Sequence, residues 1–307
     1  MEFNFYLINK LILFIIYIYI LSKIKMSVCP LLTLNNGYKI PQFGLGTFEL
    51  ENCTQSILES FKLGYRHLDT AHFYGNEKEV GEAVLKSGLK REEIFVTSKI
   101  WPTEFAHAEE ALNKMFKRIN LEYIDLVLLH WPYEDYVSAW KALEKFVKQG
   151  KIRSIGLSNF YGEDLKKILD ICEIKPVVDQ VECHLYKNKI EFKKELEKNN
   201  MLLVAYCPVR HIDEKLKTNP DILKMMEKYK KDIYQIVLRW HIQNGNIPIP
   251  KSSSLEHMKN NFNIFDFELT ADEMKLLNSI PQTTKGDPDE EGKKWVLSHP
   301  PKDDRTS

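Results

Sequence analysis

The chain has 307 residues and a formal net charge of +0, and 44% of its residues are hydrophobic. This composition is sufficient for one large domain or two ordinary ones. Balanced charge argues against nucleic acid as a partner, because proteins that bind it usually carry a basic excess. The five cysteines have no C-x-x-C spacing, so we expect reduced thiols, no disulfide framework and no bound metal.

Residues 1–25 differ in composition from the rest of the chain. Leu11 to Leu21 is an unbroken apolar run, which is short for a spanning helix of about 20 residues. Three interpretations stay open: a membrane anchor over residues 5–22, favoured by Lys23 and Lys25; a signal peptide, although no small-residue cleavage site follows; or a spurious or optional extension before Met26. We expect one domain over residues 26–307.

From residue 30 onward, short apolar segments alternate with amphipathic helical ones. A hairpin comes first, with Leu31–Leu34 and Tyr38–Pro41 on either side of a turn that contains Gly37. Later, Gly150 follows the end of a predicted helix, and Thr270 begins a capping box. Eight further strands are predicted, each followed by a helix: Phe43–Phe48, His67–Ala71, Ile94–Ile100, Ile124–His130, Ile152–Ser158, Val177–Glu182, Leu202–Pro208 and Ile247–Lys251.

Strands that alternate with helices indicate a parallel sheet with right-handed crossovers. Eight such units in about 250 residues favour an α/β fold of the closed (β/α)₈ TIM-barrel type. The alternative is a doubly wound sheet, but the glycine-rich segment at residues 44–49 lacks the third glycine of the dinucleotide fingerprint. The last 25 residues contain Gly286-Asp287-Pro288 and Pro300-Pro301, which predict an irregular C-terminal tail.

Four polar residues lie at or just after consecutive strand ends. Asp69 ends the second strand with Tyr74 in the loop beyond it, while Lys99 and His130 end the third and fourth. Because (β/α)₈ barrels carry function at the C-terminal ends of their strands, we expect the four side chains to converge at one mouth. Each alone has a structural explanation, namely a turn cap, a half-buried aromatic, a paired lysine and a hydrogen-bonded core histidine. Their common placement favours catalysis.

The stretch from Gly64 to Gly81, taken with the Lys99 and His130 motifs, resembles the aldo-keto reductase signature, and the resemblance extends over about residues 31–280. It implies reduction of aldehydes or ketones to alcohols with NADPH, with hydride from the nicotinamide. By this resemblance the catalytic residues are Tyr74, Asp69, Lys99 and His130. Tyr74 would supply the proton, and Lys99, positioned by Asp69, would lower the tyrosine pKa. His130 would orient the carbonyl oxygen.

The same resemblance implies a nucleotide site. Ser158, Asn159 and Gln180 would bind the nicotinamide carboxamide, with Tyr206 stacked on the ring. Further cofactor contacts are implied for Gly46, Thr47, Lys251, Ser252, His257 and Asn261.

Lys251 and Ser252 would hold the 2′-phosphate and Asn261 would lie near the adenine, although the Lys–Ser pair alone also suits a plain loop. His257 stands where the family usually carries arginine, which leaves the strength of the NADPH preference open.

Aromatic residues are expected to form the substrate walls, with core packing as the alternative for each: Phe48, Phe73, Trp101, Trp131 and Trp295. Phe48 stands where many members carry tryptophan. The short interval between His130 and the helix with Trp140 resembles the branch of diketogluconate reductase and prostaglandin F synthase.

Two other functions stay open. One is a nucleotide-binding barrel that serves as a regulatory or structural subunit with little turnover. The other is a barrel hydrolase with Asp69 and Glu182 as its paired carboxylates. For the reductase we expect a small carbonyl substrate and a monomeric, cytoplasmic protein, with membrane attachment only if residues 5–22 form an anchor.

Overall fold

The structure is a computed structural model that describes residues 29–283 and 290–301. The predicted leader and Met26 lie outside these ranges. The described part opens with the predicted hairpin, in which β1 (Leu31–Thr33) pairs antiparallel with β2 (Lys39–Pro41) and Leu32 lies opposite Ile40. Gly37 in its turn has a φ of 89°, a value that glycine adopts without a steric cost.

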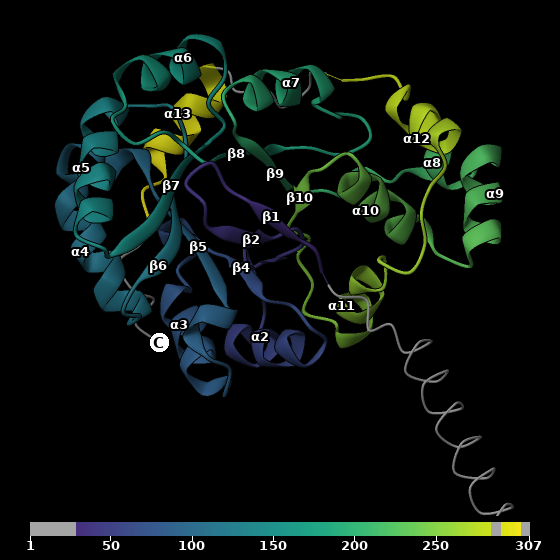
Figure 1. Cartoon of the computed structure of the whole chain (residues 1–307), viewed down its shortest axis with the longest axis horizontal. Coiled ribbons are helices and arrows are strands. Elements are labelled where there is room, and N and C mark those ends of the chain that lie inside the picture. The colour runs from purple at the N-terminus through teal and green to yellow at the C-terminus, as the bar shows by residue number, and fades with distance from the viewer. Residues whose placement is uncertain (1–28, 284–289, 302–307) are drawn as a thin grey trace, which may run out of the picture.

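Eight parallel strands follow in sequence order and form one sheet (Figure 1). The sheet closes because the amides of Gly44 and Gly46 donate to the carbonyls of Pro248 and Pro250, each at 3.1 Å. A Cβ atom at Gly46 would lie 2.8 Å from the Ile249 carbonyl oxygen, so this seam requires glycine. The (β/α)₈ barrel prediction is therefore confirmed. The strands are β3 (Leu45–Gly46), β4 (His67–Asp69), β5 (Phe95–Ile100), β6 (Ile124–Leu129), β7 (Ile152–Ser158), β8 (Val178–Glu182), β9 (Leu202–Tyr206) and β10 (Ile247–Pro248).

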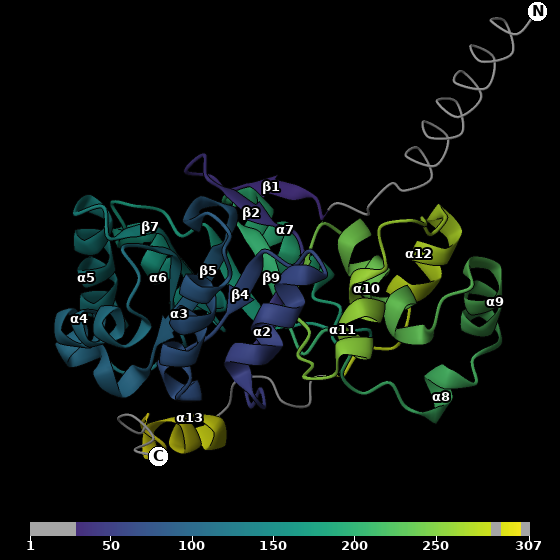
Figure 2. The same ribbon diagram turned by 90° about the horizontal axis from the view of Figure 1, so that it is seen from below.

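Helices surround this sheet (Figures 1 and 2). In α4, five residues spaced along one face are buried against the barrel, as an amphipathic period requires. Gly150 follows α5 with a φ of 74°, and Thr270 and Glu273 form the predicted capping box of α12. The helices are α2 (Cys53–Lys62), α3 (Glu77–Lys86), α4 (Ala108–Ile119), α5 (Tyr136–Lys148), α6 (Gly162–Ile171), α7 (Ile190–Lys198), α8 (Glu214–Lys217), α9 (Pro220–Tyr229), α10 (Ile233–Gln243), α11 (Leu255–Phe262), α12 (Ala271–Asn278) and α13 (Glu290–Ser298), with short 3₁₀ turns η1 (His72–Tyr74), η2 (Arg91–Glu93) and η3 (Pro102–His107).

The barrel interior is apolar at one end and polar at the other. Leu34 and Ile40, from the hairpin, join Leu126 and Leu128 of β6 in a buried cluster at the hairpin end. Because side chains alternate along a strand, the face that carries Leu126 and Leu128 also carries His130 just beyond β6. The apolar end therefore stabilises the barrel, while the same strand delivers a polar group to the opposite mouth.

The tail is more regular than its sequence suggests, because it contains α13. This helix lies at the end of the barrel opposite the hairpin (Figure 2). Val296 of α13 is buried beside Trp101, whose indole nitrogen donates to the Val296 carbonyl at 3.1 Å. Within the described residues, no helix is both long and apolar enough to cross a membrane.

Candidate active site

The structure brings the four residues from consecutive strand ends together at one mouth. The Lys99 ammonium nitrogen lies 2.6 Å from Asp69 Oδ1 and 3.2 Å from the Tyr74 hydroxyl oxygen, and it also donates to the Thr70 carbonyl at 2.9 Å. The His130 ring meets the Tyr74 ring edge-on, with 5.9 Å between their centroids. Lys99 is thus the centre of the group, with a carboxylate on one side and a phenol on the other.

Lys99 is 0% exposed, and burial alone opposes its charge. Burial lowers the pKa of Lys99, and the Asp69 carboxylate acts against this shift. The other oxygen of Asp69, Oδ2, accepts a hydrogen bond from the Gln180 side-chain amide at 2.7 Å, which fixes the carboxylate in position. The carboxylate therefore counteracts the effect of burial on Lys99 and holds the lysine in place.

The expected lowering of the tyrosine pKa is not found in this arrangement. Burial, and after it the negative charge of Asp69, raises the pKa of Tyr74 well above its ordinary value. The Lys99 charge does not reverse this shift, because it is shared with Asp69 at the shorter distance. Tyr74 consequently holds its proton at neutral pH, which is the state that a proton donor requires.

His130 is held as a neutral imidazole. Burial, with Lys99 as a second cause, lowers the pKa of His130 well below its ordinary value. Its Nδ1 atom is buried without a hydrogen-bond partner among the described residues. The mouth therefore contains one neutral imidazole and one neutral phenol beside the Lys99–Asp69 pair.

The predicted carboxamide site adjoins this group. The Asn159 side-chain amide donates to the His130 carbonyl at 3.2 Å, and its oxygen accepts from the Tyr206 hydroxyl at 3.0 Å. Ser158 donates to the Gln180 carbonyl at 2.9 Å. Asn159 has a φ of 65°, a left-handed conformation that asparagine tolerates better than most residues. Amide and hydroxyl groups thus line one side of the mouth.

The predicted phosphate residues lie where β10 leads into α11. Lys251 and His257 are exposed, Ser252 is buried and Asn261 is half-buried. Ser254 caps α11 by accepting from the His257 backbone amide at 3.3 Å. The free backbone amides at the start of a helix, together with a nearby lysine, favour the binding of an anion. These side chains form an open surface rather than a closed pocket.

Gly46 and Thr47 also lie at the mouth. Gly46 is part of the seam that closes the barrel, and the Thr47 hydroxyl donates to the Asp69 carbonyl at 3.0 Å. A cavity of about 830 Å³ has both Tyr74 and Lys251 in its walls. One cavity wall therefore includes a residue of the catalytic group and one of the predicted phosphate end.

Aromatic side chains gather on the other side of Tyr74. Phe73 stacks on Trp101 at 4.1 Å between ring centroids, and it also meets Phe48 at 6.4 Å and Trp295 at 5.9 Å. Phe48 and Trp295 are 44% and 49% exposed, so these two rings present apolar surface to the mouth. Trp131 is half-buried in the same cluster.

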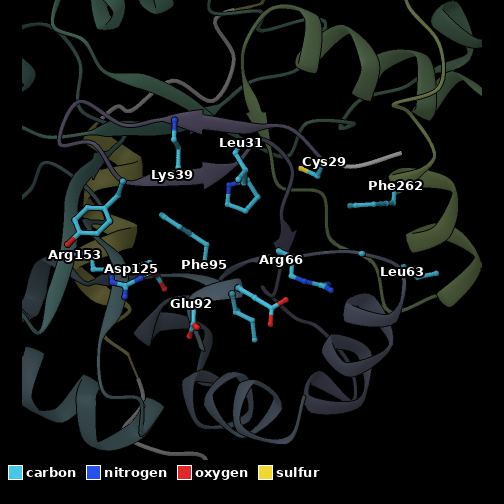
Figure 3. Close-up of a pocket in the computed structure, with 15 residues that line it drawn as sticks. Cys29, Leu31, Lys39, Leu63, Arg66, Glu92, Phe95, Asp125, Arg153 and Phe262 are labelled. Atoms are coloured by element: carbon cyan, nitrogen blue, oxygen red, sulfur yellow. Dashed lines mark hydrogen bonds and ion pairs between the residues drawn. The ribbon is translucent and has the colours of Figure 1, made fainter. Parts of the chain in front are cut away.

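A second cavity, of about 600 Å³, lies at the hairpin end of the barrel (Figure 3). Its walls mix apolar side chains such as Leu31 and Phe95 with charged ones. Asp125 in its wall accepts from Arg91 at 2.7 Å and from Arg153 at 3.3 Å. These charges compensate one another, and the cavity is remote from the strand ends that carry Asp69, Lys99 and His130.

One group of polar residues escaped the sequence analysis, which expected no metal. Glu182, His184 and His211 bring their ligand-type atoms within 4.8 Å of one another. The spacing Glu182-Cys183-His184 was a partial indication, because alternate residues along a strand share a face. His211 lies on a different loop, and no local pattern connects it to the other two.

The fold and the site define a (β/α)₈ oxidoreductase barrel with a Tyr–Lys–Asp–His group at its mouth. A family model described as Aldo/keto reductase family matches residues 42–282.

The glyoxal reductase of Bacillus subtilis is 40% identical, and the match covers 80% of this chain and 91% of the relative. The 9,11-endoperoxide prostaglandin H2 reductase of Trypanosoma cruzi is 35% identical, with 84% and 94% covered. A Bombyx mori aldo-keto reductase, solved in complex with NADP, is 29% identical with a TM-score of 0.80 and covers 89% of this chain and 98% of its own. The chain belongs to the aldo/keto reductase family and is an NADP-dependent oxidoreductase that acts on carbonyl groups.

Proposed function

We propose that the protein reduces aldehydes or ketones to alcohols with NADPH, and that Tyr74 donates the proton. The observation that carries this proposal is the position of the Lys99 ammonium, 2.6 Å from Asp69 and 3.2 Å from the Tyr74 hydroxyl. A hydroxyl that accepts a hydrogen bond from an ammonium keeps its own hydrogen free for another acceptor. A carbonyl oxygen in the mouth would be that acceptor.

When bound, NADPH would supply a hydride, which leaves negative charge on the carbonyl oxygen. Tyr74 would pass its proton to that oxygen, and the nearby Lys99 charge would stabilise the phenolate that remains. His130, held neutral by burial, would donate a hydrogen bond to the same oxygen. Asp69 would keep Lys99 in position throughout.

The residues of the chain fit a nicotinamide cofactor by their chemistry. Ser158, Asn159 and Gln180 offer the hydroxyl and amide groups that a carboxamide requires. The half-buried Tyr206 ring would lie against the nicotinamide. Gly46 and Thr47 would contact the bound cofactor.

Lys251, Ser252 and the amides that begin α11 would hold the 2′-phosphate, with His257 beside it and Asn261 near the adenine. Tyr74 and Lys251 lie in the walls of one cavity, which brings the catalytic residue and the proposed phosphate end to a common space.

Aromatic aldehydes are the substrate class that the mouth favours. The exposed rings of Phe48 and Trp295, beside Phe73, Trp101 and Trp131, would contact a flat apolar substrate. Glyoxal, the substrate in the name of the Bacillus relative, is a smaller carbonyl for comparison.

We further propose that the barrel is a cytoplasmic monomer and that residues 1–25 are no part of it.

The hydrolase alternative is disfavoured, because its two carboxylates are engaged. Asp69 is bound by Lys99 and Gln180, and Glu182 lies 3.1 Å from Lys187 Nζ and 3.0 Å from Arg210 Nη1.

The alternative of a regulatory or structural subunit needs a direct test. Consumption of NADPH should be followed with an aromatic aldehyde and with glyoxal, using the wild type and Tyr74→Phe. Turnover that the variant loses supports the proposal, whereas cofactor binding without turnover in the wild type would support a regulatory subunit.

A further inference from the structure

A second polar cluster lies beside the proposed cofactor site and has no part in the reduction. It consists of Glu182 at the end of β8, His184 just after it and His211 in the loop between β9 and α8. One ligand-type atom from each lies within 4.8 Å of the others. Across residues 29–283 and 290–301, this is the one group of three such side chains at that spacing.

His184 is the unusual member. It is 1% exposed, and neither ring nitrogen has a hydrogen-bond partner within the described structure. Its Nε2 atom lies 3.6 Å from Glu182 Oε1, too far for a hydrogen bond, and its ring meets the His211 ring edge-on at 5.3 Å. A buried imidazole whose ring nitrogens make no hydrogen bond costs free energy even beside a carboxylate, so this arrangement requires an explanation.

We propose that Glu182, His184 and His211 bind a divalent transition-metal ion of the Zn²⁺ type. Imidazole and carboxylate are ligands that Zn²⁺ accepts at about 2.0–2.2 Å, and a tetrahedral ion at that distance separates its ligand atoms by roughly 3.3–3.5 Å. The 3.6 Å between His184 Nε2 and Glu182 Oε1 is slightly longer than this separation, and the three ligand atoms lie within 4.8 Å of one another, so they would draw closer together on an ion. Three protein ligands leave a fourth position for water.

Two cations compete for Glu182. Arg210 lies 3.0 Å from Oε1 and Lys187 lies 3.1 Å from Oε2. The Arg210 side chain is 53% exposed and can move into solvent, whereas Lys187 is buried. A metal ion would therefore displace Arg210 from Oε1 and leave Lys187 on Oε2. Affinity should depend on this competition.

An ion at this position would affect the loop that follows Tyr206. Glu182 lies opposite Tyr206 in the register of β8 and β9, and the loop with Arg210 and His211 follows Tyr206 directly. An ion bound to all three ligands would fasten this loop to the end of β8. On the proposed function, in which Tyr206 contacts the nicotinamide, the fastened loop should slow NADPH release.

The test is a titration of the full chain, after removal of metals with a chelator, with Co²⁺ followed by its visible absorption and with Zn²⁺ followed by calorimetry. We expect one equivalent to bind. His211→Gln should weaken binding at least as much as the loss of an outer-shell partner, about 10–100-fold. His107→Gln, an exposed histidine outside the cluster, is the matched control and should change nothing. Arg210→Gln should tighten binding, because it removes a competing cation.

Weak binding of several ions with no saturating site, or equal binding by His211→Gln and His107→Gln, would overturn the proposal. So would weaker binding by Arg210→Gln. His211 lies on an exposed loop, so its replacement tests the site without the folding risk of changing Glu182. The titration needs no turnover, and its outcome is separate from that of the reductase assay. Stopped-flow release of NADPH, with and without Zn²⁺, tests the loop, and an unchanged rate would refute its fastening.

Discussion

The two ends of the proposed site are built in different ways. At the catalytic corner, Asp69 and Lys99 are buried, bonded to each other and supported by Gln180 and the Thr70 carbonyl. At the phosphate end, Lys251 and His257 extend into solvent. One end is complete within the fold, while the other gains its partner only when a phosphate arrives.

The difference follows from the cost of burial. A buried ammonium or carboxylate must find its partner within the protein, so the catalytic corner forms as part of the folded barrel. Exposed cations are solvated and contribute little to stability. Substitutions in the catalytic corner should therefore lower both the unfolding free energy and the reaction rate. Substitutions at the phosphate end should change only the affinity for the cofactor.

The largest expected effect is at Tyr74. Tyr74→Phe keeps the ring and removes the proton donor, so kcat should fall by about 10²–10⁴-fold. NADPH binding, measured by fluorescence titration, should be nearly unchanged, because the proposed cofactor contacts stay in place. A variant that keeps most of its kcat would show that another group supplies the proton.

Asp69→Asn should affect stability as well as rate. It leaves the Lys99 ammonium buried with a neutral neighbour, and breaking a buried ion pair costs about 3–5 kcal/mol. Urea unfolding should show the loss. Lys251→Met, which removes an exposed cation, should change the unfolding free energy by less than about 0.5 kcal/mol. Equal effects of the two substitutions would contradict the proposed contrast between the ends.

Much of the catalytic corner was predictable from sequence. Strand ends of a (β/α)₈ barrel meet at one mouth, so the positions of Asp69, Lys99 and His130 after apolar segments predicted their convergence. The sequence shows Gly44 and Gly46 as a pair of glycines, but it does not show that they close the barrel. The carbonyls that accept from them belong to Pro248 and Pro250, which are distant in sequence.

Three features depend on contacts that no local pattern carries. Helix α13 lies between proline-containing segments, and it is held by contacts such as the Trp101 bond to Val296. His211 reaches Glu182 and His184 only through the fold. The raised pKa of Tyr74 follows from burial and the nearby negative charge of Asp69, which residue types alone do not determine.

Acid should destabilise the barrel through His67, a buried histidine two residues before Asp69. Burial lowers the pKa of His67 from 6.5 to about 4, so the unfolded chain takes up a proton between these values while the folded barrel does not. Stability must then fall as pH falls from 6.5 toward 4, by about 2 kcal/mol at pH 5 from this residue. Unfolding free energies at pH 7 and pH 5 test it. His67→Gln should reduce the pH dependence by that amount.

The smallest expected effect concerns the phosphate itself. Histidine lacks the permanent charge and the flat bidentate fork of arginine. His257→Arg therefore places a permanent, forked cation beside the proposed phosphate site, which should tighten NADPH by about tenfold. NADH should bind as before because it has no 2′-phosphate.

The measurement is Kd for both cofactors at pH 8, where the 2′-phosphate is fully ionised, in the wild type and in His257→Arg. The ratio of the two proteins' affinities for NADPH isolates residue 257. A ratio of one would place His257 away from the phosphate. Equal wild-type affinity for NADPH and NADH would refute the wider assignment, because Lys251 alone should already favour the phosphorylated cofactor.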